Sequence, residues 1–332
     1  MEYKILFASC LVLTFAATAV ISRFLIPVLK SRKMGQKILE IGPRWHKSKE
    51  GTPTMGGLSF IIPIILFGVG ASVFLWIKDG VEAATPLVLT LCLGLAGGFI
   101  GCIDDRAKLR NKRNEGLTAP QKFLLQVIAA ALYLLGMRFI CNMSTELYIP
   151  YFNVTWDMGI FFYFFAVILI CGMMNSVNLT DGIDGLASGI TLIVGIFFAV
   201  AGFTSYGTDG RAVTLGGLLV GGTAGFLIYN FYPARVFMGD TGSLFLGGLV
   251  VGGAFMIRNP LIIVVAGLVY IIETLSVMLQ VAYFKLTHGK RLFKMSPIHH
   301  HFEQCGWSEI KIVVVFSAVT ALFCAAAFFG LR

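Results

Sequence analysis

Three short segments combine aspartates with glycines, and these residue types suggest metal-dependent chemistry. They read Gly101-Cys102-Ile103-Asp104-Asp105, Asn178-Leu179-Thr180-Asp181-Gly182-Ile183-Asp184-Gly185 and Phe237-Met238-Gly239-Asp240-Thr241-Gly242-Ser243. Carboxylates of this kind hold a hard divalent cation, which neutralises phosphate oxygens. A single loop aspartate could equally be a solvated helix cap. The chain has only 17 acidic residues, and five of them lie in these three clusters. This clustering favours the metal-site interpretation.

A fourth segment is rich in histidine and reads Met295-Ser296-Pro297-Ile298-His299-His300-His301-Phe302-Glu303. Zinc binding is one interpretation of three adjacent imidazoles. Three consecutive side chains, however, point about 100° apart on a helix and alternate on a strand. No cysteine lies at a spacing typical of a zinc site. We therefore predict imidazoles that bind phosphate or sugar oxygens, rather than a zinc centre.

Two further segments carry weaker signals. The segment from Lys49 to Gly57 combines a cation, threonines and glycines. It could cradle a phosphate, although an ordinary helix start with Thr and Pro would look the same. Glu273 and Gln280 are seven residues apart and so lie on one face of a helix. For Glu273 we favour a hydrogen bond between helices of a bundle.

The elements that position these residues are membrane-spanning helices. The 332 residues are 57% hydrophobic and only 13% charged, which one soluble core cannot accommodate. Apolar runs of about 20 residues recur along the whole chain and predict an all-α polytopic membrane protein. We predict ten transmembrane helices in a single integral-membrane domain, residues 1–332. The runs cover residues 4–29, 55–77, 84–103, 121–141, 157–175, 185–204, 212–230, 243–257, 260–286 and 310–330.

The charge distribution predicts the orientation of these spans. Loops that follow odd-numbered spans share one face, and they hold most of the 26 Lys and Arg residues. The positive-inside rule makes this face cytoplasmic and both termini extracytoplasmic. Each aspartate cluster follows an odd-numbered span, so all five aspartates are predicted on the cytoplasmic face.

These motifs, taken in order, closely resemble the signature segments of the phospho-N-acetylmuramoyl-pentapeptide transferase family. This family is a branch of the polyprenyl-phosphate N-acetylhexosamine-1-phosphate transferases. The resemblance extends from the basic loop near Lys49 to the last span. The aspartate motifs are shared across the superfamily. The segment Thr52-Pro53-Thr54-Met55-Gly56-Gly57 and the three histidines are more particular to this branch.

The resemblance implies an activity and its partners. It implies Mg²⁺-dependent transfer of phospho-N-acetylmuramoyl-pentapeptide from UDP-N-acetylmuramoyl-pentapeptide to undecaprenyl phosphate, which releases UMP and forms lipid I. The active site would lie on the cytoplasmic face of the bacterial inner membrane. The implied assembly is a homodimer in contact with membrane lipid and without a nucleic-acid partner. A short extracytoplasmic β-hairpin is implied between spans 4 and 5.

The resemblance also assigns residue roles. The catalytic set is Asp104, Asp105, Asp184, Asp240 and His299. Mg²⁺ is assigned to Asp240, Asp105 and Asp184, while Asp104 is the base or the positioning group for the lipid phosphate. Asp181, Asn230 and Phe237 form the uridine pocket. Phosphate, sugar or nucleoside groups are bound by Lys49, Thr54, Lys108, Lys122, Asn175, Gln280, His299 and His300.

Two other functions would also fit a chain with many spans and polar motifs. An N-acetylglucosamine-1-phosphate transferase of the same superfamily would keep the aspartates and change the sugar-side loops, and the three histidines argue against it. A secondary transporter also has many spans, but it places polar groups near the bilayer midplane. Here the polar groups gather at one face.

Overall fold

A computed structural model of the chain describes residues 1–32, 49, 51–111, 116–204 and 208–331. Within these residues, ten helices are long and apolar enough to cross a membrane, which confirms the predicted number of spans. They are α1 (Glu2–Ser31), α2 (Leu58–Asp79), α3 (Val81–Asn111), α4 (Ala119–Phe139), α5 (Phe161–Thr180), α6 (Leu186–Thr204), α7 (Gly210–Asn230), α8 (Gly239–Met256), α10 (Leu268–Leu286) and α12 (Glu309–Phe329). Two short helices, α9 (Ile262–Ala266) and α11 (Ile298–Gln304), complete the helical elements. The basic segment 33–48 lies outside the described residues.

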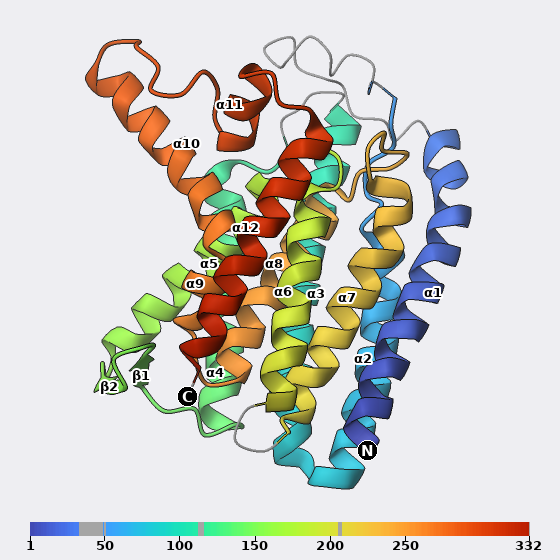
Figure 1. Cartoon of the computed structure of the whole chain (residues 1–332), viewed down its shortest axis with the longest axis vertical. Helices are drawn as coiled ribbons and strands as arrows, with labels where there is room; N and C mark the ends of the chain where they lie inside the picture. Colours follow the sequence, from blue (N-terminus) through green and yellow to red (C-terminus); the bar gives the residue numbers. More distant parts are fainter. Residues whose placement is uncertain (33–48, 50, 112–115, 205–207, 332) are drawn as a thin grey trace.

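A two-stranded hairpin lies between α4 and α5, as the resemblance implied. Strand β1 (Glu146–Ile149) pairs antiparallel with β2 (Val154–Asp157), and Glu146 lies opposite Asp157. Pro150 follows β1 and so does not interrupt the hydrogen-bond ladder. The hairpin lies at the same end of the bundle as both chain termini (Figure 1).

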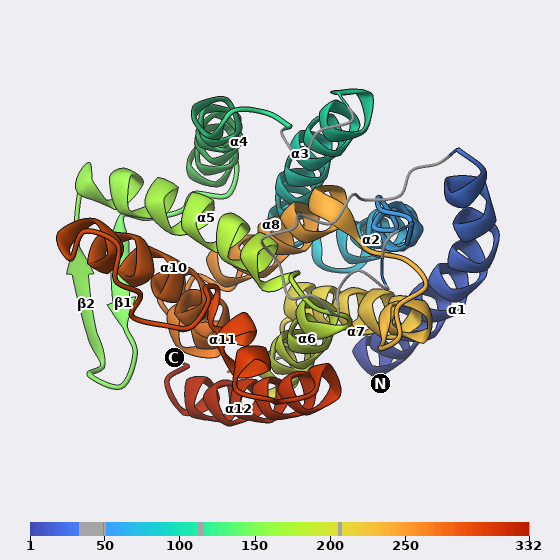
Figure 2. The same ribbon diagram turned by 90° about the horizontal axis from the view of Figure 1, so that it is seen from above.

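Helix α8 forms the centre of the bundle (Figure 2). Nearly nine-tenths of its apolar window is buried, 89%, and it packs against α3 and α5. Its glycines allow this close approach, since a Cβ on Gly247 or Gly248 would meet the backbone of α5 or α3. The glycine-rich run in α7 serves the same purpose against α1, where Gly221 faces the Leu11 carbonyl.

Some helix boundaries differ from the predicted apolar runs. Helix α3 continues to Asn111 rather than ending near 103, and α8 begins at Gly239 rather than at 243. The run predicted at 260–286 is divided into α9 and α10 at Gly267. Hydropathy reports where apolar side chains end, whereas a helix continues as long as its backbone hydrogen bonds do. Asp104, Asp105 and Asp240 are therefore residues of helices and not of loops.

Candidate active site

Three carboxylates meet where the last turns of α3 contact the first turn of α8. Asp104 is 2% exposed and Asp105 is 4% exposed. One carboxylate oxygen from each of Asp104, Asp105 and Asp240 lies within 4.8 Å of the other two. Within the described part of the chain, this is the one such group of three or more potential metal ligands. Gly101 makes the approach possible, because a Cβ there would overlap the Asp240 carbonyl.

Asp105 fixes the start of α8. Its Oδ1 accepts a hydrogen bond from the Asp240 backbone N–H at 3.2 Å, and its Oδ2 accepts from the backbone N–H of Thr241 at 2.9 Å. The Thr241 hydroxyl also donates to Oδ2, at 2.7 Å. A carboxylate at this position satisfies the free N–H groups of the helix and complements its dipole. Asp105 therefore holds the Asp240 side chain in the cluster.

Two lysines partly neutralise the carboxylates. Lys108 Nζ lies 2.6 Å from Asp104 Oδ2 and 3.0 Å from Asp240 Oδ2. Lys122 Nζ lies 2.7 Å from the same Asp240 oxygen. Asn178 donates to the other Asp240 oxygen at 3.0 Å. Four elements, α3, α4, α5 and α8, thus converge on one largely buried group of charges.

The donor set fits a hard divalent cation. Carboxylate oxygens are the ligands that such cations prefer. The Thr54 hydroxyl is also buried, 4% exposed, and its oxygen has no hydrogen-bond partner among the described residues. A Cβ on Gly239 would fill the space between this hydroxyl and Asp105 Oδ2. The site therefore offers three anionic oxygens and one free hydroxyl beside a small space.

Asp184 lies outside the group of three carboxylates, although the resemblance implied that it binds the metal. Lys49 Nζ lies 2.7 Å from Asp184 Oδ1 and 2.6 Å from Glu309 Oε2. The other Asp184 oxygen accepts from the Ala234 backbone N–H at 2.8 Å. Asp184 thus joins the Lys49 segment to the loop before α8, and the structure groups Asp104, rather than Asp184, with Asp105 and Asp240.

Asp181 lies in the loop between α5 and α6. Burial raises the pKa of its carboxyl well above the ordinary value, and the charges of Asp240, Asp105 and Asp184 raise it further. Among the described residues, no side chain or backbone group donates a hydrogen bond to this carboxyl. It is therefore available to a polar ligand.

Asn230 ends α7, and Phe237 lies in the structured loop that follows it. Asn230 is 1% exposed, accepts from Ser188 Oγ at 3.1 Å and donates to the Val236 carbonyl at 3.0 Å. The Phe237 N–H donates to the Pro53 carbonyl at 2.9 Å, and its own carbonyl accepts from Gly56 at 2.8 Å. Asn230 therefore shapes the loop, and the half-buried Phe237 ring stands where this loop meets the Thr54 segment.

The three histidines of α11 point to different partners. His299 is fully buried, and its Nδ1 lies 3.0 Å from Glu273 Oε2 on α10. His300 Nδ1 lies 2.5 Å from Glu303 Oε2, and His301 Nδ1 accepts from the Lys294 N–H at 3.1 Å. The Nε2 of His299 contacts Gly182, where any side chain would collide with the ring. His299 thus connects α10 to the Asp181 loop.

The remaining predicted binding residues hold neighbouring segments. Gln280 Oε1 accepts from the backbone N–H groups of Leu292 and Phe293, at 3.0 and 2.9 Å. Asn175 donates to Gln126 Oε1 at 2.7 Å. Both amides therefore position the chain around the site.

Three contributors were not predicted as site residues. Asn178 belongs to the second aspartate motif, and Glu309 begins an apolar span with no motif around it. Glu273 does form the predicted hydrogen bond to another helix, and its partner is the buried His299 of α11. In the sequence, a lone glutamate within or at the start of an apolar run is the signal that could have marked Glu273 and Glu309.

The sequence also matches known proteins along nearly its whole length. Residues 87–258 match glycosyl transferase family 4, and residues 49–61 match phospho-N-acetylmuramoyl-pentapeptide-transferase signature 1. A relative of that name from Staphylococcus aureus (strain bovine RF122 / ET3-1) is 47% identical over 311 residues, 93% of each chain. One from Clostridium botulinum (strain Eklund 17B / Type B) is 44% identical over 326 residues, 97% of this chain and 96% of the relative.

A third relative, from Heliobacterium modesticaldum, carries the same name and is 47% identical over 92% of both chains. The first signature contains Lys49 and Thr54, and the family match contains all three carboxylates of the cluster. The chain belongs to the phospho-N-acetylmuramoyl-pentapeptide-transferases of glycosyl transferase family 4.

Proposed function

We propose that this chain transfers phospho-N-acetylmuramoyl-pentapeptide from UDP-N-acetylmuramoyl-pentapeptide to undecaprenyl phosphate. An oxygen of the lipid phosphate attacks the phosphorus that carries the sugar. The bond from this phosphorus to the UMP oxygen breaks, UMP leaves with the electron pair, and lipid I forms. The carboxylate cluster of α3 and α8, with its flanking lysines, carries this proposal. Residues 1–332 act as one transferase domain.

The reaction brings two anions together, so charge neutralisation and alignment supply most of the rate. Asp104, Asp105 and Asp240 would hold Mg²⁺, which when bound neutralises phosphate oxygens. Lys108 and Lys122 bring two further positive charges to the same place. Asp104 orients the lipid phosphate or accepts its proton. The second pKa of a phosphate monoester is near 6, so most of the lipid phosphate has already lost this proton at neutral pH.

The nucleoside binds between the Asp181 loop and the Phe237 loop. Asp181 offers an unpaired carboxyl to a ring N–H, and Phe237 offers a ring face for stacking. Lys49 lies beside this space and is held between Asp184 and Glu309. We assign Asp184 to this anchoring role, because its two oxygens are engaged by Lys49 and Ala234.

The site faces the cytoplasm of a bacterial inner membrane in this proposal. The basic loops after odd-numbered spans support that orientation, and α11 with its histidines lies at the same end as the cluster (Figure 1). The functional unit is a homodimer, as the resemblance implies.

The test is product formation by the purified chain in detergent. It receives undecaprenyl phosphate, Mg²⁺ and either UDP-N-acetylmuramoyl-pentapeptide or UDP-N-acetylglucosamine. We expect lipid product from the first nucleotide alone, and none after chelation. Product from the second alone would keep the metal site and reject the proposed sugar.

Asp240→Asn separates the metal role from general damage. We expect a loss of at least about 100-fold in turnover, because charge neutralisation at the phosphates fails. Asp79→Asn is the matched control, since among the described residues Asp79 accepts side-chain hydrogen bonds from Tyr3 alone, at the opposite end of the bundle. Full Mg²⁺-dependent turnover by Asp240→Asn would contradict the assignment.

A further inference from the structure

The last turns of α10 stand clear of the rest of the bundle. The buried residues of this helix are Val269, Tyr270, Glu273, Ser276 and Gln280. After Gln280, all six residues from 281 to 286 are exposed. Six residues make more than one helical turn, so every side of the helix is exposed there. The helix also leans outward from its neighbours towards this end (Figure 1). The end of α10 is therefore not packed into the bundle.

This exposed end is apolar. Leu286 is 80% exposed, and Val281 and Phe284 are each 46% exposed. Successive residues of a helix turn by about 100°, so these three side chains lie on different sides of α10. Such a turn is unfavourable in water without a protein partner. Because α10 is one of the ten helices long and apolar enough to cross a membrane, a bilayer supplies the surroundings that this turn needs.

The segment that follows carries positive charge only. Its four cations are Lys285, Lys290, Arg291 and Lys294, and all are exposed. No Asp or Glu occurs from residue 274 to residue 302. None of the four cations forms an ion pair with a described residue. Arg291 and Lys294 donate to backbone carbonyls at 3.4 and 3.0 Å, which leaves their charges uncompensated. A group of this kind attracts an anionic surface.

Hydrogen bonds fold this segment back against α10 and bring the cations to similar depths. Gln280 Oε1 accepts from the N–H groups of Leu292 and Phe293, at 3.0 and 2.9 Å. Arg291 therefore lies near the level of Gln280, and Lys285 is five residues, or about 7.5 Å, farther along the helix. The head-group layer of a bilayer is about 5–8 Å deep. A planar surface requires charges at one depth and not their convergence on one point, and this arrangement meets that requirement.

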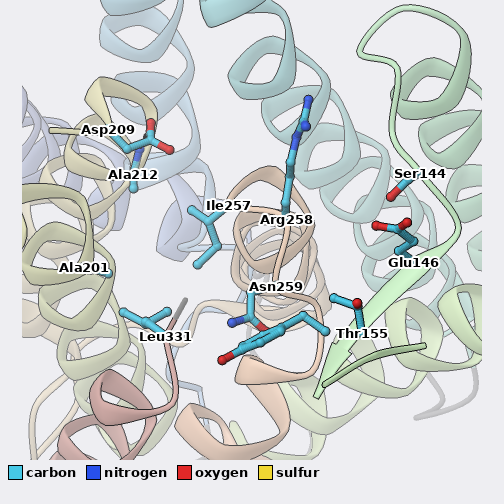
Figure 3. A pocket seen from close by; sticks show the side chains of 11 residues that line it. Ser144, Glu146, Thr155, Ala201, Asp209, Ala212, Ile257, Arg258, Asn259 and Leu331 are labelled. Atoms are coloured by element: carbon cyan, nitrogen blue, oxygen red, sulfur yellow. Dashed lines mark hydrogen bonds between the residues drawn. The ribbon is translucent and has the colours of Figure 1, made fainter. Parts of the chain in front are cut away.

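The cavity at the opposite end of the bundle has a different character. It has a volume of about 320 Å³ and is lined in part by Glu146, Asp209 and Arg258. Asp209 is engaged by the Arg211 guanidinium at 2.9 and 2.8 Å. The Arg258 side chain points away from Asn259 of the same wall (Figure 3). Charges of both signs line this cavity, so it offers no comparable attraction for an anionic surface.

We propose that residues 281–294, the α10–α11 surface, bind anionic phospholipids of the adjacent membrane leaflet. Phe284 and Leu286 lie among the acyl chains, and the four cations bind lipid phosphates at the depth of the head groups. The Lys285 stem covers apolar surface while its ammonium group reaches a phosphate. A soluble phosphate has no acyl chains for the exposed turn, and one molecule of lipid substrate cannot surround a helix on every side. Bilayer phospholipids provide both the chains and the charges.

The test is quenching of a fluorophore by the lipids next to it. The full-length chain, with its seven native cysteines replaced, carries a bimane label at Leu286→Cys. It is reconstituted in vesicles of equal parts phosphatidylglycerol and phosphatidylcholine, and one of the two lipids is brominated at a time. The ratio of quenching gives the local enrichment of phosphatidylglycerol. We expect at least about fivefold, the factor for one basic residue near an anionic surface.

Charge variants locate the binding. Lys285→Gln combined with Lys290→Gln removes two of the four cations and should abolish most of the enrichment. The matched control is Lys30→Gln combined with Arg32→Gln, which removes two exposed cations at the end of α1. This control should leave the enrichment unchanged. A label at Phe123→Cys, an exposed residue of α4, should not respond to the loss of the two lysines.

The readout does not require turnover, so it is independent of the proposed transfer reaction. Equal quenching by the two lipids, or quenching by neither, would overturn the proposal. An enrichment that persists without the two lysines would do the same. So would one that equimolar undecaprenyl phosphate abolishes, because the cations would then serve the substrate phosphate.

A second measurement applies if the cysteine-free chain does not fold. Native mass spectrometry of the chain with its own cysteines compares the same two lipids with matched acyl chains. We expect the chain to bind phosphatidylglycerol at least about fivefold more tightly. Equal binding of both lipids would again overturn the proposal.

Discussion

Asp181 differs from the other aspartates of the site, because it lies outside the spans and has no hydrogen-bond donor among the described residues. Burial and three neighbouring carboxylates raise the pKa of its carboxyl. A carboxyl whose pKa is raised on folding binds its proton more tightly in the folded chain than in the unfolded one. Its contribution to stability is complete below the unfolded-chain pKa of about 3.9. That contribution is lost as the pH rises towards the raised pKa.

Asp181→Asn removes this titration. We expect the difference in melting temperature, variant minus unmodified chain, to be larger at pH 7.5 than at pH 4.5, because only the unmodified chain loses stability over that interval. Thermal unfolding in detergent at both pH values measures it. The same difference at both pH values would show that Asp181 is not perturbed in the folded chain.

Glu273 acts on the site through His299. Both side chains are fully buried, and Glu273 also accepts from the His299 backbone N–H at 3.5 Å. Glu273→Gln keeps the shape but weakens a charged hydrogen bond. We expect kcat to fall about tenfold with a small change in melting temperature. Glu273→Leu leaves the His299 ring without this partner and should lower both kcat and the melting temperature. An unchanged kcat for Glu273→Leu would show that the orientation of His299 is irrelevant.

At the scale of helices, the contact between α3 and α8 decides where the carboxylates meet. Gly101→Ala should force the start of α8 away from α3, because the new methyl group overlaps the Asp240 carbonyl. We expect a loss of about 1–3 kcal/mol in stability and about 100-fold in turnover, the cost of a misplacement near 1 Å.

Gly172→Ala is the matched control for that change. Gly172 is an exposed residue of α5, and a Cβ there has no atom within 4 Å. Alanine favours helix by up to about 1 kcal/mol relative to glycine. This variant should keep full turnover. Equal turnover by both variants would show that the α3–α8 spacing does not control the site.

Helix α12 contributes its first residue to the site. Glu309→Ala should raise KM for the nucleotide, because Lys49 loses one of its two carboxylate partners. Ser308→Ala is the control: it removes only the helix cap made by Ser308 Oγ to the Lys311 N–H and costs about 1 kcal/mol in stability. A similar KM for the Glu309→Ala and Ser308→Ala variants would mean that Glu309 affects nucleotide binding only by stabilising the start of α12.

The sequence predicted the elements well and their ends less well. Ten spans, the hairpin and the aspartate motifs follow from composition, alternation and resemblance. The end of α3 could not be predicted in this way, because Asp104 and Asp105 interrupt the apolar run but not the backbone hydrogen bonds of the helix. The position of Asp184 could not be predicted either, because its partners Lys49 and Glu309 lie 135 and 125 residues away in the sequence. Such pairings depend on tertiary packing, which local patterns do not encode.

At the scale of the whole molecule, the two ends of the bundle have different characters. One end carries the carboxylates and α11, and the other carries both termini and the hairpin (Figure 1). Orientation can be tested with single cysteines in a chain whose seven native cysteines are replaced. In intact cells, Phe152→Cys in the hairpin should react with a membrane-impermeant maleimide. Lys290→Cys, in the segment between α10 and α11, should react only after lysis, and the reverse pattern would invert the proposed topology.

The anchoring of Lys49 has a consequence for biosynthesis. Lys49 lies near the start of the chain, and Glu309, one of its two partners, lies 260 residues later. A nascent chain that has been inserted as far as α10 already contains every carboxylate of the cluster. It still lacks the residue that holds Lys49 in place, so the finished site arises only when the last helix enters the membrane.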